Sequence, residues 1–303
     1  MRSRSDPASI RGSIAPLVTP FDGDGSIDLA AVARLVQWQL DHGTHGISVG
    51  GSTGEPTSQS IEERISVMEA AAAAIDDRVP FLPGTGSARI DETLELTAAA
   101  QRVGADAALV VAPYYARPTQ AALRDWYATV AGEFPDLPII VYNVPIRSAV
   151  DVAPETIAAL AREHDNIVGV KETTRDFEHV SYVLHACGSD FLAFSGIELL
   201  CYPMLAIGGS GHLSCVANFA PRPVAELYDR FAAGDHDEAR RLHYELHPLV
   251  ELAFLETNPV PAKWAMQRLG ILDSAHARPP LAPLSEASVA RAEQILAAEP
   301  VAT

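Results

Sequence analysis

Lysine is rare in this chain and occurs only at Lys171 and Lys263. Lys171 ends the apolar run at 167–170, which predicts a buried strand with the amine at its carboxyl end. An amine in that position is partly desolvated, which favours the neutral form that attacks a carbonyl carbon. The alternative for Lys171 is an ion pair with Glu172 or Asp176. For Lys263, which lies in a helical pattern near the C-terminus, we expect a place on a solvated helix face.

The stretch GGSTGE at 50–55 follows another apolar run and precedes a helical pattern. Its glycines let backbone N–H groups approach a small anion, and the hydroxyls of Ser52 and Thr53 can bind a carboxylate or relay a proton. The stretch has neither the lysine of a phosphate-binding P-loop nor the spacing GxGxxG, so a nucleotide site is not indicated. The alternative is a tight turn without a ligand.

The stretch YNVPIR at 142–147 follows a third apolar run. The hydroxyl of Tyr142 can exchange a proton with a substrate, and Arg147 can hold a carboxylate through two N–H bonds. The alternatives are a core tyrosine with a hydrogen-bonded hydroxyl and a surface ion pair of the arginine. PYYARP at 113–118 follows a fourth predicted strand, and GGSGHLS at 208–214 occupies the last one. The alternatives are packing of the paired tyrosines and a place where only backbone fits the glycines.

Short β-rich runs alternate with longer amphipathic stretches over most of the chain, which is typical of a parallel sheet covered by helices. We expect strands at 13–18, 46–50, 80–83, 107–111, 137–142, 167–170, 191–194 and 209–214. Helices are expected between them, at 29–42, 61–75, 91–103, 120–133 and 154–163. Eight such units predict an α/β protein with a closed (β/α)8 TIM barrel, and a doubly wound sheet is the alternative.

The strand pattern stops after Ala220, and helices are expected at 223–233, 236–255, 261–269 and 286–298. We therefore predict a flexible N-terminal arm at 1–12, a barrel at 13–233 and a C-terminal helical extension at 234–303. In a barrel of this kind the chemistry lies at the carboxyl ends of the strands, where the stretches described above fall.

The composition excludes several classes of function. A formal net charge of -17 opposes binding to nucleic acid or to anionic lipid surfaces. No apolar run approaches the roughly 20 residues of a membrane span, and no secretory signal is evident at the N-terminus. The ten histidines and three cysteines show no metal-ligand spacing and no disulfide framework, so we expect no metal and a reducing, cytoplasmic location.

With these stretches assembled, the chain resembles the dihydrodipicolinate synthase and N-acetylneuraminate lyase family of class I aldolases. GSTGE, PYYARP, YNVPIR, GVKET and GSGHLS carry the resemblance, which extends from about residue 12 to residue 270. The combination is far more specific than any one of its members.

The resemblance implies roles for individual residues. Lys171 matches the lysine that forms an imine with pyruvate, so no separate cofactor is expected, and Tyr142 matches the general acid/base. Ser52 matches the position that passes protons between Tyr142 and Tyr115, and Tyr115 matches a tyrosine donated across a subunit interface. Four further residues are expected to bind the substrates. Thr53 and Gly51 would bind the carboxylate of pyruvate, and Arg147 would bind the carboxylate of the second substrate. The backbone carbonyl of Leu213 would lie near the imine.

The family's activity suggests two reactions for this chain. One condenses pyruvate with aspartate 4-semialdehyde to 4-hydroxytetrahydrodipicolinate, and the other cleaves a 4-hydroxy-2-oxo acid, such as a dihydroxyheptenedioate or a sugar acid, to pyruvate and an aldehyde. A barrel that binds a ligand without catalysis is a third possibility. The resemblance also implies a homotetramer built from tight dimers. Ile61 and Ala88 replace the histidine and asparagine of lysine-sensing members, although Glu92 is retained, so we expect no strong feedback by lysine. Ser52 in place of threonine and Arg175 in place of glycine leave the aldehyde open.

Overall fold

A computed structural model of the chain describes residues 7–299 and residue 301. These residues form two compact units that interleave along the sequence. One unit joins residues 7–11 to Pro80–Leu213, and the other joins Gly12–Val79 to the segment that begins at Ser214. We name them the β3–β7 unit and the β1–β2 unit after the strands that they contain.

The β3–β7 unit contains five parallel strands in the order β7-β6-β5-β4-β3. Their side chains are buried along nearly the whole length of each strand, as expected for a parallel sheet covered on both faces. The strands are β3 (Ala108–Val111), β4 (Ile139–Asn143), β5 (Ile167–Glu172), β6 (Leu192–Ser195) and β7 (Gly211–Leu213).

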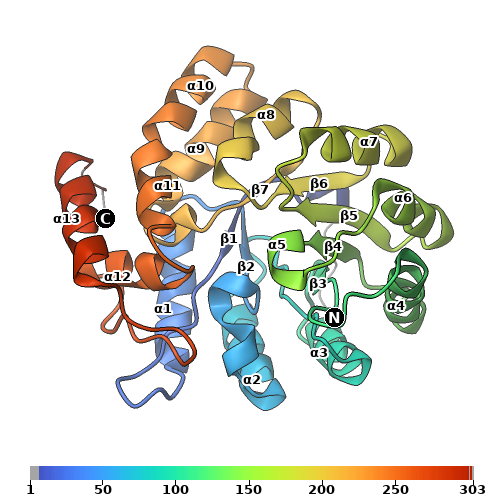
Figure 1. Cartoon of the computed structure of the whole chain (residues 1–303), viewed down its shortest axis with the longest axis horizontal. Helices are drawn as coiled ribbons and strands as arrows, with labels where there is room; N and C mark the ends of the chain where they lie inside the picture. Colours follow the sequence, from blue (N-terminus) through green and yellow to red (C-terminus); the bar gives the residue numbers. More distant parts are fainter. Residues whose placement is uncertain (1–6, 300, 302–303) are drawn as a thin grey trace. The chain divides into compact units, whose positions relative to one another are not determined.

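Helices follow the strands of this unit, and Figure 1 shows α4, α6 and α7 as neighbours beside the sheet. The helix α7 and the two short helices α5 and α8 lie in segments for which the sequence analysis gave no helix bounds. The helices are α3 (Ile90–Arg102), α4 (Gln120–Glu133), α5 (Pro145–Ser148), α6 (Pro154–Glu163), α7 (Phe177–Cys187) and α8 (Cys201–Ala206). The sequence prediction gave the bounds of α4 and α6 as the structure has them.

The strand expected at 80–83 is not a regular strand. The segment is extended beside β3, where the Leu109 N–H donates to the Pro83 carbonyl at 2.9 Å and Gly84 forms an isolated parallel bridge with Leu109. Because Pro80 and Pro83 have no N–H groups, the segment cannot complete a hydrogen-bonded ladder. The position of this element was predicted correctly, and its assignment as a strand was wrong.

The β1–β2 unit pairs β1 (Gly12–Pro16) with β2 (Gly46–Ser48) in parallel and carries seven of the longer helices. Its N-terminal helices are α1 (Leu29–Asp41), capped by the Asp28 carboxylate, and α2 (Ile61–Ile75), which begins with a reciprocal capping box between Ser60 and Glu63. Its C-terminal helices are α9 (Pro221–Ala232), α10 (His236–Glu245), α11 (His247–Ala253), α12 (Val260–Arg268) and α13 (Glu286–Ala298).

The single helix expected at 236–255 is two helices, α10 and α11, that meet at Leu246. Pro248 stands in the first turn of α11, where its missing N–H costs nothing, whereas within a continuous helix it would break a hydrogen bond. Among the described residues, no helix is both long and apolar enough to cross a membrane.

Part of the predicted N-terminal arm, residues 1–6, lies outside the described residues. Pro7–Ser9 form a short 3-10 helix, and Ile10 is fully buried. The division into an arm, a barrel at 13–233 and an extension at 234–303 stays a prediction.

Candidate active site

Lys171 and Tyr142 lie side by side on neighbouring strands of the β3–β7 unit. They are register partners on β5 and β4, so their side chains leave the same face of the sheet. The Lys171 Nζ lies 4.2 Å from the centroid of the Tyr142 ring, and only 6% and 5% of the two residues is exposed. The structure thus places an amine and a phenol together in an environment with little access to water.

The residues proposed as alternative ion-pair partners of Lys171 are engaged elsewhere. The Glu172 carboxylate accepts hydrogen bonds from the Thr173 N–H at 2.9 Å and the Thr174 N–H at 2.8 Å. The Asp176 carboxylate caps α7. Within the described part of the chain Lys171 forms no ion pair, so that alternative is wrong and the amine is not committed to a carboxylate.

Gly196, which follows β6, leaves the space that the Lys171 side chain occupies. A Cβ at this position would lie 2.8 Å from Lys171 Cε and 2.3 Å from Thr173 Cγ2, both too close for carbon atoms. Any larger residue would therefore displace the lysine stem. The sequence analysis did not identify this glycine, and the SGIE stretch offers no pattern that separates it from an ordinary turn.

Behind the lysine and tyrosine, the next residue of each strand belongs to a buried polar network. Asn143 donates to the Glu172 carboxylate at 3.0 Å and to Asp151 at 2.6 Å. His179, on α7, places its Nε2 3.1 Å from the Glu172 carboxylate. Burial alone would lower the pKa of His179, but Glu172 and, more weakly, Asp151 and other acids outweigh it and raise that pKa. Sequence reasoning missed this network because its members have no motif spacing.

The other expected site residues of this unit lie at strand ends. Leu213 ends β7 and is buried, and Arg147 lies on the short helix α5 with an exposed side chain. Tyr115 is 94% exposed, and its φ of 73° is a left-handed conformation that few non-glycine residues adopt. Such exposure leaves a large apolar ring without a packing partner among the residues that the structure describes.

Gly51, Ser52 and Thr53 lie in the β1–β2 unit, in the loop that follows β2. Ser52–Gly54 form one 3-10 turn. Thr53 is buried, and its Oγ1 accepts a hydrogen bond from Asn258 Nδ2 at 3.0 Å. With its acceptor position used in this way, the Thr53 hydroxyl keeps its own proton to donate to an anion.

Lys263 is not on a solvated helix face, and that prediction was wrong. Its side chain is fully buried, and its Nζ forms an ion pair with Glu55, the last residue of GSTGE. The amphipathic pattern of α12 did not identify this position as buried because the compensating carboxylate comes from a distant part of the chain.

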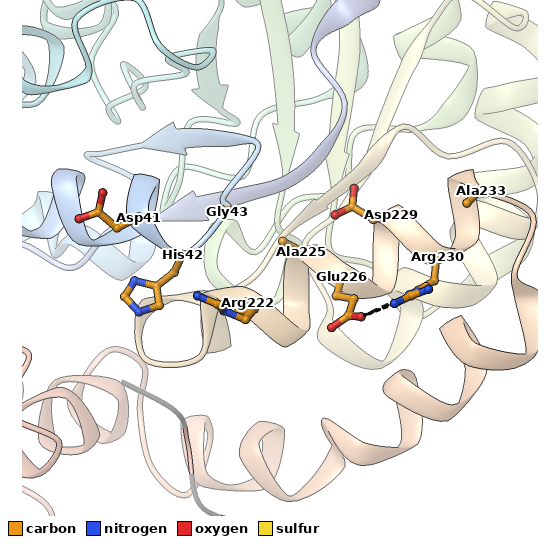
Figure 2. Close-up of a pocket in the computed structure, with 9 residues that line it drawn as sticks. All are labelled: Asp41, His42, Gly43, Arg222, Ala225, Glu226, Asp229, Arg230 and Ala233. Carbon is orange, nitrogen blue, oxygen red and sulfur yellow. Dashed lines mark hydrogen bonds and ion pairs between the residues drawn. The ribbon is translucent and has the colours of Figure 1, made fainter.

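No group of three or more histidine, cysteine or acidic side chains suited to a metal occurs among the described residues. A surface hollow of about 530 Å³ lies in the β1–β2 unit, where the C-terminal end of α1 approaches α9 (Figure 2). Arg230 in its lining is paired with Glu226. None of the expected site residues lines this hollow, so it is no part of the predicted site.

A sequence profile of the Dihydrodipicolinate synthetase family matches residues 9–299 of the chain. The chain belongs to this family. The family membership expected from the five motifs is thereby confirmed, and so is the expectation that the chain is an enzyme of the class I aldolase type.

Individual members of the Dihydrodipicolinate synthetase family are similar over nearly their whole length. The 4-hydroxy-tetrahydrodipicolinate synthase of Thermus thermophilus is 44% identical over 273 residues, which cover 90% of this chain and 91% of the relative. A crystal structure of the dihydrodipicolinate synthase from Acinetobacter baumannii, complexed with pyruvate, is 36% identical with a TM-score of 0.92 and covers 97% of this chain and 100% of its own. A structure described as the first monomeric dihydrodipicolinate synthase variant is 35% identical with a TM-score of 0.92 and covers 98% and 99%.

The likeness to these family members also confirms the predicted fold class, a (β/α)8 TIM barrel with a C-terminal helical extension. The doubly wound alternative is thereby excluded. In this fold the carboxyl ends of the strands carry the chemistry. Lys171 is the penultimate residue of β5, and Tyr142 is the penultimate residue of β4.

Proposed function

We propose that this protein is a pyruvate-dependent lyase that condenses pyruvate with aspartate 4-semialdehyde to 4-hydroxytetrahydrodipicolinate. The observation that carries the proposal is the Lys171 amine, buried, free of ion pairs in the described chain, and 4.2 Å from the Tyr142 ring. Membership of the family and the names of its similar relatives support the same reaction.

In the proposed reaction the neutral Lys171 amine adds to the keto carbon of pyruvate. Loss of water from the carbinolamine gives an imine, whose positive nitrogen withdraws electrons from the methyl carbon. Removal of a methyl proton then gives an enamine, and its carbon attacks the aldehyde of the second substrate to give an adduct that is again an imine of Lys171. The amino group of the second substrate adds to the imine carbon and displaces the Lys171 amine, which closes the ring and frees the product. Tyr142 is the proposed general acid/base for these proton transfers. Because the imine of Lys171 itself withdraws the electrons, the proposed reaction needs no separate cofactor.

The remaining site residues have proposed roles in binding and proton transfer. Thr53, with the backbone N–H groups around Gly51, binds the carboxylate of pyruvate, and the available proton on the Thr53 hydroxyl suits that role. Ser52 passes protons between Tyr142 and a partner subunit's copy of Tyr115. Arg147 binds the carboxylate of the second substrate, and the Leu213 carbonyl lies near the imine.

We also propose a cytoplasmic homotetramer, a dimer of dimers, whose partners are two small-molecule substrates and neither nucleic acid nor membrane. Three free cysteines fit a reducing compartment. The exposed Tyr115 ring supports a close subunit contact. A barrel at 13–233 with an arm before it and a helical extension after it is the proposed domain organisation.

The first experiment tests the covalent chemistry. Borohydride added together with pyruvate should reduce the imine and leave a stable adduct, which peptide mass spectrometry should locate at Lys171. The Lys171→Ala variant should show no adduct. An unchanged mass for the wild-type protein would contradict the proposed function and favour a noncatalytic binder.

The second experiment separates the two directions of reaction. Aspartate 4-semialdehyde and pyruvate, coupled to the reductase that consumes the product, should give turnover. If the wild-type protein forms the pyruvate adduct but gives no turnover at millimolar aldehyde, the cleavage of a 4-hydroxy-2-oxo acid would replace the proposed condensation.

A further inference from the structure

The second lysine of the chain, Lys263, lies in an unusual environment for a charged side chain. It leaves α12 and is 0% exposed. Its Nζ donates to the Glu55 carboxylate and to the His276 carbonyl at 2.8 Å, and it lies 4.2 Å from the centroid of the Phe21 ring. Burial lowers the pKa of Lys263 to about 8, although the Glu55 charge opposes that shift. Because the desolvation of both charges offsets most of their attraction, a buried ion pair adds little net stability. The burial of Lys263 with Glu55 therefore calls for an explanation other than stability.

Glu55 occupies a backbone conformation that needs support. Its φ of 55° and ψ of 45° are left-handed, and non-glycine residues keep such values only where the surroundings hold them. The Glu55 carboxylate is held twice, by Lys263 and by the Arg278 backbone N–H at 3.0 Å. Glu55 ends the 3-10 turn of Ser52–Gly54 and begins the next one, so its conformation sets the direction in which that turn faces.

The same turn is held from the C-terminal segment at a second point. Asn258, two residues before α12, donates to the Thr53 hydroxyl. The Gly54 carbonyl accepts from the Thr19 hydroxyl at 2.7 Å and from Gln59 Nε2 at 2.5 Å. Every residue from Thr53 to Glu55 is therefore held by a side chain from elsewhere in the unit, and two of the three are held from the C-terminal segment.

Arg278 completes the arrangement around the buried pair. Its guanidinium lies 4.5 Å from the Phe21 ring, on which the Lys263 amine also stacks, and it binds Glu63 through two bonds of 2.8 and 2.6 Å. Glu63 is the residue that closes the capping box of α2. The extension thus contacts both the end of the GSTGE turn and the start of the helix that follows.

We propose that Lys263 is a positioning residue for pyruvate binding, in that its buried pair with Glu55 fixes the turn that presents the Thr53 hydroxyl and the backbone N–H groups to the pyruvate carboxylate. The inference rests on the proposed function, because it takes Thr53 as the carboxylate-binding residue. It assigns the C-terminal extension a part in the reaction, although the extension contributes no reacting group.

The test compares Lys263→Met and Glu55→Gln with the wild-type protein and with Arg268→Met. Methionine removes the amine and retains an unbranched stem, and glutamine retains the shape of Glu55 without its charge. Arg268, on the same helix, pairs with Glu293 on the surface, so Arg268→Met removes an ion pair that does not reach the turn. For each protein the pyruvate concentration that gives half-maximal borohydride trapping is measured, together with maximal trapping and the KM for the aldehyde.

For Lys263→Met we expect the half-trapping concentration of pyruvate to rise on the order of tenfold to a hundredfold, because small misplacements of binding groups have effects of this size. Maximal trapping and the aldehyde KM should change little, and Arg268→Met should behave as the wild type. If Lys263→Met does not fold, a smaller rise in Glu55→Gln supports the same conclusion.

Two outcomes would overturn the inference and leave the proposed function standing. The first is an unchanged half-trapping concentration of pyruvate in the folded variants. The second is an equal impairment of the half-trapping concentration, the maximal trapping and the aldehyde KM, which would indicate a general structural defect. Failure of the wild-type protein to trap pyruvate would instead refute the proposed function, and the inference with it.

Discussion

At the scale of single residues, the proposed site assigns the covalent bond to one side chain, the amine of Lys171, and the proton transfers to another, the phenol of Tyr142. Tyr142 lies beneath the Lys171 Nζ, and both side chains are nearly buried. Phenylalanine at position 142 would keep the ring and its contact with the lysine while removing the hydroxyl. This substitution therefore tests the chemistry of the tyrosine rather than its packing.

We predict that Tyr142→Phe lowers kcat by about a hundredfold, the effect typical of losing a general acid/base. Steady-state kinetics with saturating pyruvate and aldehyde would measure it. Tyr127→Phe is the matched control, because Tyr127 is a fully buried tyrosine of the same unit whose hydroxyl donates only to the Val110 carbonyl in the described chain. A kcat near that of the wild type in Tyr142→Phe would remove this hydroxyl from the mechanism.

At the scale of elements, β4, β5 and α7 are joined behind the site by Asn143, Glu172 and His179. The alternation of a strand explains why this happens. Because Tyr142 and Lys171 face one side, the residues that follow them face the other, where helices cover the sheet. A buried carboxylate in that layer must be paired, and His179 with Asn143 supplies the partners.

The raised pKa of His179 gives this network a dependence on pH. A histidine whose pKa is higher in the folded than in the unfolded protein adds stability that is fully present below its ordinary pKa of 6.5 and is lost as the pH rises through the folded value. We expect His179→Asn to lower the free energy of unfolding by about 2 kcal/mol at low pH, the scale of a hydrogen bond to a charged group, and by less at high pH.

Urea unfolding of the wild type and the variant at a series of pH values between about 5.5 and 9, the range around a histidine pKa, would measure the difference. His185→Asn, on an exposed position of the same helix, is the control. A difference between His179→Asn and the wild type that is constant over the whole range would show that the histidine acts by packing and not by charge.

Local signals in the sequence predicted much of this architecture. The amphipathic spacing gave the bounds of α2, α4 and α6, and the apolar runs gave the strand that carries Tyr142 and the strand near whose end Lys171 lies. Prediction failed where a residue's environment depends on distant partners. The burial of Lys263 depends on Glu55, and the proline-containing segment at 80–83 has the hydropathy of a strand without the N–H groups of one.

At the scale of the whole molecule, arginine supplies the positive side chains of the surface, and both lysines are buried. Exposed arginines pair with nearby acids, as in Arg124 with Glu163 and Arg291 with Glu251, and solvent screening leaves such pairs little effect on stability. Since neither lysine is on the surface, no exposed lysine amine can form a nonspecific imine with pyruvate. The borohydride trapping experiment is therefore selective for the proposed chemistry.

Tyr115 connects a single chain to the proposed oligomer. Its ring is exposed in the isolated chain, and the proposed reaction needs its hydroxyl beside that of Ser52 in another subunit. In that arrangement each site combines Lys171 of one subunit with Tyr115 of another, so Lys171→Ala and Tyr115→Phe impair different halves of a shared site. A subunit that keeps Lys171 but has lost Tyr115 would be completed by a Lys171→Ala partner, whose Tyr115 is intact.

We therefore predict that mixed oligomers of the two variants regain activity that each variant lacks alone. The two chains, carrying different affinity tags, would be coexpressed, and assemblies with both tags would be assayed for turnover. Oligomers of each variant by itself provide the controls, and light scattering on the purified proteins would establish that all three assemblies have the same size. Mixed assemblies of that size with no more activity than the controls would mean that Tyr115 acts within its own chain or not at all.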